Sequence, residues 1–235
     1  MAALNREQIF YTWDATNSPL SKIMTGINWI HLSDWHQNNV SLDSEVVDES
    51  QRDKFLKDRF DRNLIRDKLL EDIQQREKID SRLKNIDFII FSGDLTYNGR
   101  NEEFEEIKKE LLDPLLKACG DLDPSKLFIV PGNHDLNRAD FKLLPSDLLS
   151  YLTEENASSW LSDDRNLARV LEPFYYYNNF IKNYTKQKQP LFGSFSEMDL
   201  GEHKIALIGF NSALMCGRKD EHGNIDDERN IIIGE

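Results

Sequence analysis

Cysteine and proline are scarce in this chain, which has 2 Cys, 7 Pro and 11 Gly among 235 residues. Such contents exclude collagen-like, low-complexity and disulfide-stapled small proteins. The two cysteines, Cys119 and Cys216, stand far apart and fit neither a C-x-x-C motif nor a zinc-ligand spacing. This pattern predicts free thiols in a reducing compartment, with a structural disulfide as the open alternative.

Long apolar runs and excess basic charge are also missing. No apolar run approaches the roughly 18 residues that span a bilayer, and the segment from Met1 to Glu7 lacks the apolar core of a signal peptide. We therefore expect a soluble, cytoplasmic protein without a membrane partner. The chain has 29 Lys and Arg against 42 Asp and Glu, a net charge of −13. Binding of a phosphate group therefore requires local positive charge, such as that of metal ions.

Hydrophobic residues make up 39% of the chain, which is enough for one sizeable core. Short apolar strands alternate with helical patterns, and this order predicts an α/β fold. Strands are expected over 27–33, 86–91, 126–130, 192–197 and 204–210. Helices are expected over 50–80, with an apolar stripe from Leu56 to Ile73, and from Phe104 to Leu115, with a bend at Asp113-Pro114. Residues 140–190 are expected to be helical and irregular.

Polar side chains follow the first three predicted strands. Asp34 and His36 come after the first strand, Asp94 after the second, and Asn133 and His134 after the third. Open α/β sheets bind ligands at the carboxyl ends of their strands. Carboxylate, imidazole and amide groups suit divalent metals, and two ions about 3.5–4 Å apart need a shared carboxylate. The residue types thus fit a two-metal hydrolytic site, although each motif alone is also typical of a turn.

In this order the motifs resemble the D-x-H, G-D and G-N-H-[DE] blocks of the calcineurin-like metallophosphoesterase superfamily. The resemblance implies a layered α/β/β/α sandwich over residues 27–235, preceded by an N-terminal extension over 1–26. It implies that Asp34 and His36 hold one metal, that Asp94 bridges two, and that Asn133 binds the second. His134 would be the catalytic residue, giving a proton to the leaving oxygen while a metal-bridging hydroxide attacks phosphorus.

The resemblance implies two divalent metal ions, with Mn²⁺ expected and Fe, Zn, Ni or Mg as alternatives. One departure concerns the second block, which in many members reads G-D-x-x-D. Here Tyr97 replaces the second Asp, so the carboxylate that would pair with His134 is missing. A tyrosine at this position binds iron in purple acid phosphatases. A packing or hydrogen-bonding tyrosine is the other interpretation.

The family's later histidine blocks form a second departure. The chain has five His, and His203 and His222 match neither block, so we expect both to be exposed. We therefore expect the fold to be incomplete at its C-terminus and the domain to end before its last ligands. A longer chain with further C-terminal domains is expected, as is weak turnover by these 235 residues alone.

Finer resemblances concern the substrate. Ser33-Asp34-Trp35-His36 is similar to the first block of SbcD-type DNA repair nucleases. Residues 91–96, 130–138 and 209–213 are similar to class III cyclic-nucleotide phosphodiesterases and to phosphoesterase domains fused to bacterial signalling or antiviral defence NTPases. These likenesses imply a nucleotide or nucleic-acid phosphodiester as substrate. Arg138 is a candidate phosphate contact, with an ordinary loop salt bridge as the alternative. The alternative function is a catalytically weak or silent interaction module.

Overall fold

The computed structural model describes residues 26–38, 49–141, 154–188, 193–201, 203–214 and 216. The first sheet has three parallel strands in the order β1 (Trp29–Leu32), β2 (Phe88–Phe91) and β3 (Leu127–Ile129). A second sheet is the antiparallel pair β4 (Gly193–Asp199) and β5 (Lys204–Phe210). All five strands were predicted from the sequence to within two residues at each end.

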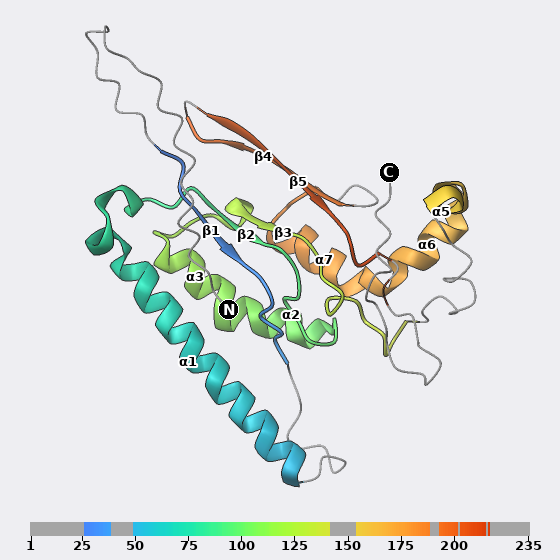
Figure 1. The fold of residues 1–235 in the computed structure, drawn as a ribbon, viewed down its shortest axis with the longest axis horizontal. Helices are drawn as coiled ribbons and strands as arrows, with labels where there is room; N and C mark the ends of the chain where they lie inside the picture. The colour runs from blue at the N-terminus through green and yellow to red at the C-terminus, as the bar shows by residue number, and fades with distance from the viewer. Residues whose placement is uncertain are drawn as a thin grey trace, which may run out of the picture.

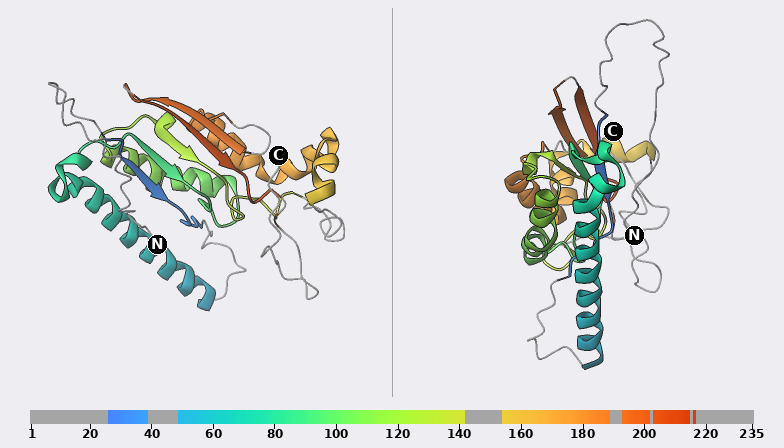
Figure 2. Two further views of the ribbon diagram at one scale, coloured as in Figure 1. Left: turned by 45° about the horizontal axis from the view of Figure 1, so that its top comes forward. Right: turned by 90° about the vertical axis from the view of Figure 1, so that its left-hand side faces the viewer.

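Both faces of the first sheet are apolar, as parallel strands covered on two sides require. Successive side chains alternate between the faces. Ile89 and Phe91 belong to the main core beneath the helices, whereas Phe88 and Phe128 pack with Met198 of β4. The second sheet therefore lies on the other face of the first, as the two views of Figure 2 show.

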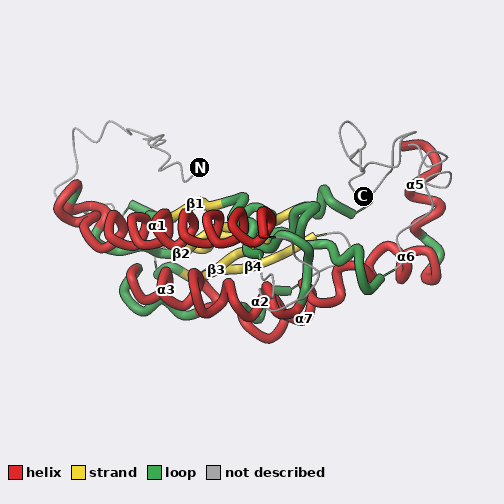
Figure 3. The backbone as a smooth tube through the Cα atoms, turned by 90° about the horizontal axis from the view of Figure 1, so that it is seen from below, coloured by secondary structure: helices red, strands yellow, loops and turns green. Residues whose placement is uncertain are grey.

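Six α-helices complete the described fold: α1 (Glu49–Ile79), α2 (Asn101–Ile107), α3 (Asp113–Ala118), α5 (Glu154–Leu161), α6 (Asp164–Leu171) and α7 (Tyr175–Tyr184). Helices α2, α3 and α7 cover one face of the first sheet (Figure 3). Helix α1 runs along the β1 edge and contacts α3 (Figure 1). Among the described helices, none is both long enough and apolar enough to cross a membrane.

The irregularity expected at Asp113-Pro114 takes the form of a π-helical turn. Residues Lys108–Leu112 form this turn between α2 and α3, so the helical backbone continues from 101 to 118. Proline lacks the N–H that an α-helix needs at an interior position, and a π turn just before it accommodates the missing bond. Leu111, Leu112 and Leu115 are fully buried, which fixes this segment against the sheet.

Helix α1 was predicted correctly, but only its C-terminal third buries the apolar stripe. Ile73 is in the core and Leu69 packs against it, whereas Phe60 and Ile65 are 67% and 55% exposed. The reason is positional, because the N-terminal part of α1 projects beyond the other described elements in Figures 1 and 2.

The described residues form three layers, helix, sheet and sheet, of the predicted α/β/β/α arrangement. Ile208 and Phe210 of β5 are exposed on the face where a fourth layer is expected. The predicted N-terminal extension, apart from Gly26, lies outside the described residues, and so does His222. His203 is exposed in the turn between β4 and β5, as expected.

Candidate metal centre

The loops that follow β1 and β2 are joined by main-chain hydrogen bonds beyond the ends of the strands. The amide of Asp34 donates to the carbonyl of Gly93 at 3.1 Å, and the amide of His36 donates to the carbonyl of Asp94 at 2.9 Å. These bonds continue the parallel ladder into the loops. The first two sequence motifs are therefore held at a fixed offset from each other.

Three predicted ligands have left-handed backbone conformations. The φ angles of Asp34, His36 and Asp94 are 59°, 52° and 55°. A left-handed conformation costs a residue with a side chain roughly 1–2 kcal/mol. Three such residues in one site indicate that these loops direct side chains to a common point at the expense of local backbone energy.

The third loop packs directly on Asp94 through Gly132. A methyl group at Gly132 would overlap Oδ1 of Asp94 and lie 2.5 Å from its amide nitrogen, so only glycine fits. The next contact is polar, because the amide of His134 donates to Asp94 Oδ1 at 2.9 Å. The second and third motifs are thus joined through one carboxylate.

Asp135 fixes the same two loops from the buried side. Its carboxylate is fully buried and accepts hydrogen bonds from the amides of Leu95, Thr96 and Gly132 and from the Thr96 hydroxyl, at 2.9–3.3 Å. Burial is the main reason that its pKa rises to about 6. Asp135 is the fourth residue of the G-N-H-[DE] motif, and no role was predicted for it. An acidic fourth letter in that motif was the available signal.

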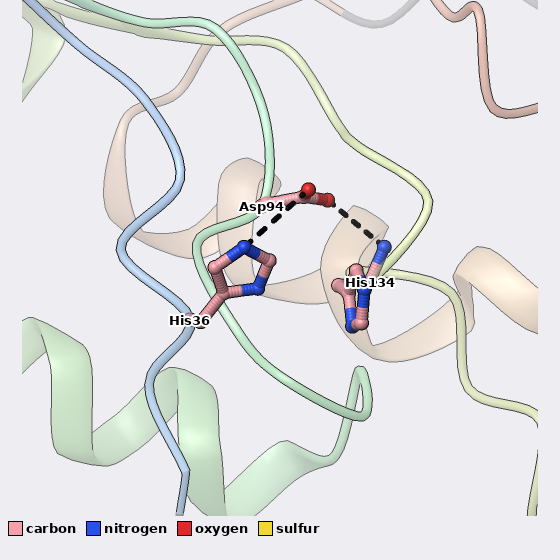
Figure 4. Close-up of side chains that lie close together, drawn as sticks. All are labelled: His36, Asp94 and His134. Atoms are coloured by element: carbon pink, nitrogen blue, oxygen red, sulfur yellow. Dashed lines mark hydrogen bonds and ion pairs between the residues drawn. The ribbon is translucent and has the colours of Figure 1, made fainter. Parts of the chain in front are cut away.

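His36, Asp94 and His134 bring their ligand atoms within 4.8 Å of one another, each from a different loop (Figure 4). His36 Nε2 lies 3.8 Å from Asp94 Oδ2 and 3.9 Å from Asp34 Oδ1. Two ligands of one ion, each about 2.0–2.2 Å from it, lie roughly 3–3.5 Å apart. Only a small approach of these side chains would place a cation among them.

The state of His36 also fits a metal ligand. Burial lowers its pKa, and this effect exceeds the opposing influence of Asp94, so the neutral ring that binds metal is favoured. Its Nδ1 is buried and has no hydrogen-bond partner within the described ranges. A neutral imidazole facing two carboxylates is a donor set suited to a divalent cation.

The ring of His134 is oriented by the main chain of Tyr97. Its Nδ1 lies 2.8 Å from the Tyr97 carbonyl oxygen, which can only accept, so Nδ1 carries the proton and Nε2 is free. The Tyr97 ring packs 5.3 Å from the His134 ring and is 46% exposed. A carbonyl thus occupies the position expected of a carboxylate, and it does so whatever side chain residue 97 carries.

The structure places all five predicted site residues on three adjacent loops. Asp34 lies at the exposed edge, with its side chain 61% accessible, and Asn133 is half-buried in the turn beside His134. His134 joins the candidate metal-binding group, whereas the resemblance gave it a catalytic role. The ligand roles of Asp34, His36, Asp94 and Asn133 and the role of His134 stay predictions.

The buried residue Glu103 holds the loop that carries Tyr97, and this role was not predicted. Glu103 is completely buried and accepts hydrogen bonds from the amides of Asn98 at 2.9 Å and Arg100 at 3.2 Å. A glutamate three residues after the residue that precedes a helix is the signal that was available. Neither the buried Cys119 nor the half-buried Cys216 forms a disulfide, which confirms the predicted thiols.

Comparison with known proteins agrees with this geometry. A family model described as calcineurin-like phosphoesterase matches residues 27–214. The chain therefore belongs to the calcineurin-like phosphoesterase family, which catalyses phosphoester hydrolysis with a dinuclear metal site. Neither the curated proteins nor the solved structures gave a match. The resemblance noted from the motifs is confirmed for the superfamily, and its narrower branches stay predictions.

Proposed function

We propose that this protein is a phosphodiesterase that cleaves a nucleotide or nucleic-acid phosphodiester with two divalent ions, Mn²⁺ first among them. The observation that carries the proposal is the meeting of His36, Asp94 and His134 at the carboxyl ends of three parallel strands. Mixed imidazole and carboxylate ligands suit manganese, iron and zinc better than calcium.

The residues divide into ligands and a proton donor. Asp34, His36, Asp94 and Asn133 would hold the ions, which supply a lowered pKa for bound water and neutralise charge on the phosphoryl group. In its doubly protonated form His134 would give the Nε2 proton to the leaving oxygen and keep the Nδ1 proton, which the Tyr97 carbonyl accepts. The centroids of the His134 and His36 rings lie 4.6 Å apart. The His134 ring is therefore beside the ligands, in a position that suits contact with a bound phosphate.

Support for a diester over a monoester comes from the motifs. Residues 91–96 and 130–138 are similar to cyclic-nucleotide phosphodiesterases and to phosphoesterase domains of bacterial defence proteins. On the same likeness we propose a cytoplasmic effector domain in signalling or antiviral defence. The net charge of −13 argues against a grip on long duplex DNA, and so favours short substrates.

The direct test is hydrolysis of bis-p-nitrophenyl phosphate against p-nitrophenyl phosphate, with metal content measured on the same protein. We expect slow, Mn²⁺-stimulated cleavage that favours the diester, is lost in EDTA and returns when Mn²⁺ is restored. A matched control is His31→Ala, because His31 is exposed on β1 and bonds Ser92 Oγ at 2.7 Å, outside the cluster. This variant should keep the wild-type rate.

Two other results would change the conclusion. Preference for the monoester would replace the phosphodiesterase by a phosphomonoesterase. Two bound ions without hydrolysis of either compound would favour the alternative, an interaction module that keeps the fold and lacks turnover.

A further inference from the structure

The peptide group between Tyr97 and Asn98 is hydrogen-bonded on both sides by side chains. Its carbonyl oxygen lies 2.8 Å from Nδ1 of His134, and its N–H donates to Oε2 of Glu103 at 2.9 Å. A peptide group is planar and trans, so its carbonyl and its N–H point in opposite directions. Glu103 and His134 are therefore connected through this single peptide group.

The carboxylate of Glu103 is completely buried, and its bonds exceed those of an ordinary helix cap. It also accepts from the amide of Arg100 at 3.2 Å and from Nδ2 of Asn98 at 3.1 Å. The bond to Arg100 belongs to the capping box at the start of α2. Helix α2 does not need the bonds to Asn98, which lies two residues before Arg100. Glu103 therefore holds the Tyr97 loop in addition to capping α2.

Other contacts fix the two ends of the same loop. The amide of Tyr97 donates to the Gln37 carbonyl at 2.9 Å, and the amide of Gly99 donates to Thr96 Oγ1 at 3.1 Å. Gly99 has a φ of 63°, and a methyl group there would lie 2.6 Å from the carbonyl carbon of Leu136 in the third loop. The ends of the loop are thus fixed, and the bond to Glu103 sets the direction in which the intervening peptide group points.

This arrangement gives the peptide carbonyl two effects on His134. Its fixed direction holds the imidazole ring through Nδ1. Hydrogen bonds in a chain polarise one another, so a carboxylate that accepts from the peptide N–H makes the carbonyl a stronger acceptor. A stronger acceptor at Nδ1 favours the tautomer with the proton there and stabilises the doubly protonated ring. In many family members a carboxylate at the position of Tyr97 would do this directly.

We propose that Glu103 is a positioning residue for the reaction and acts on His134 through the peptide group between Tyr97 and Asn98. It replaces the carboxylate that the second motif lacks. The Nδ1 proton stays on His134, only the Nε2 proton moves to the leaving oxygen, and Glu103 neither gains nor loses a proton. The effect on catalysis rests on the proposed function, in which His134 is the proton donor.

The first test is ¹⁵N NMR of the histidine rings in EDTA at about pH 8.5, where imidazole is neutral. We expect the wild-type His134 ring to carry its proton on Nδ1, with its signals assigned by their absence from His134→Ala. In Glu103→Ala these signals should shift towards a mixture of both tautomers. Glu103→Gln keeps an oxygen acceptor but loses the charge, so the Nδ1-protonated form should decrease without disappearing.

Glu102→Ala is the matched control, because Glu102 is an exposed acidic residue in the same first turn of α2. It should leave the His134 signals unchanged. Unchanged signals in folded Glu103→Ala, or a wild-type ring protonated on Nε2, overturn the inference. Thermal unfolding identifies any variant that fails to fold. If Glu103→Ala does not fold, Glu103→Gln decides, and signals identical to those of wild type overturn the inference.

The second test measures kcat with Mn²⁺ on the dinucleotide TpT and on bis-p-nitrophenyl phosphate. Glu103→Ala should lower kcat on TpT by about 10–100-fold, the usual cost of losing a residue that orients a group of the site. The fall should be smaller on bis-p-nitrophenyl phosphate, whose leaving group hardly needs a proton. Added to His134→Ala, the substitution should change kcat by less than about twofold, because the group on which Glu103 acts is already gone. Equal falls on both compounds, or an undiminished fall without the His134 ring, overturn the inference.

The NMR measurement needs no turnover, so the two proposals can fail separately. A change of the His134 tautomer in Glu103→Ala, with no hydrolysis by wild-type protein, leaves the positioning role in place and removes the proposed function. Metal-dependent hydrolysis by wild-type protein, with the same His134 tautomer in every folded variant of Glu103, overturns this inference and leaves the proposed function in place.

Discussion

One carboxylate, that of Asp94, links the second and third loops of the site. The amide of His134 donates to Asp94 Oδ1 at 2.9 Å, while Asp94 Oδ2 faces His36 Nε2 at 3.8 Å. The first of these contacts uses the main chain of His134 and not its ring. The two residues can therefore be separated by mutation, because removing the His134 ring leaves the bond to Asp94 intact.

Asp94→Ala should empty the metal site. The substitution removes the oxygen that faces His36 and the acceptor for the His134 amide, so the third loop loses its anchor. Even residues that only support a ligand contribute about 10–100-fold to metal affinity, so the loss here should be at least that large. Metal analysis after dialysis against Mn²⁺ measures it. The exposed Asp164 provides the control Asp164→Ala, and unchanged metal content in Asp94→Ala would remove Asp94 from the site.

His134→Ala should keep the metals and lose turnover. A general acid contributes about 10²–10⁴-fold, so kcat should fall by that factor. The fall should be smallest on bis-p-nitrophenyl phosphate, whose leaving group hardly needs a proton, and larger on a dinucleotide. Rates on both compounds and metal content of the same preparation check this. Loss of metal in His134→Ala would make His134 a ligand, which its place in the cluster also permits.

Much of this site could be predicted because each motif is local. Asp34, Asp94 and Asn133 follow strands that apolar runs mark clearly, and parallel strands bring their carboxyl ends to one edge. What could not be predicted depends on contacts between distant segments. The Tyr97 carbonyl that holds His134 has no sequence signature, since any residue supplies a carbonyl.

The same distinction applies to the helices. The helical period of α1 could be recognised in the sequence. The fraction of its apolar stripe that is buried, however, depends on where the other helices end. Its N-terminal part projects beyond them, so Phe60 stays exposed while Ile73 is buried. The charged face of such a helix is ordinarily solvated. Packing of the β1 loop beside the helix instead leaves Arg62 half-buried.

Gly132→Ala should damage the site although it replaces none of the predicted ligands. The added methyl group would overlap Asp94 Oδ1, so either the carboxylate or the third loop must move. Overpacking of this kind costs roughly 1–3 kcal/mol, and we expect the free energy of unfolding to fall by that amount together with metal affinity. Gly26→Ala is the control, because a methyl group there meets nothing within 4 Å. Wild-type metal binding and stability in Gly132→Ala would contradict the close packing.

Asp135→Ala should destabilise the fold as a whole. Four donors converge on this buried carboxylate, from Leu95, Thr96 and Gly132, and alanine leaves them without an acceptor. Each unsatisfied buried donor costs about 1–3 kcal/mol, and water entering the cavity offsets part of this. We therefore expect the free energy of unfolding in urea to fall by about 3 kcal/mol or more. Asp199→Ala, which removes an exposed carboxylate bonded to the Gly201 amide, should change it by less than about 1 kcal/mol.

Cys119 should be unreactive in the folded protein and reactive once the chain unfolds. Burial against the core raises the pKa of its thiol to about 11, so at pH 8 only about one thiol in a thousand is ionised. Cys216→Ser isolates this thiol, and its reaction with iodoacetamide should be at least about 100-fold slower than that of free cysteine. In 8 M urea the two rates should converge, since unfolding restores the ordinary pKa. Rapid labelling of the native variant would show that α3 does not hold Cys119 in the core. Cys119→Ser, which leaves the half-buried Cys216, should react faster than Cys216→Ser under the same native conditions.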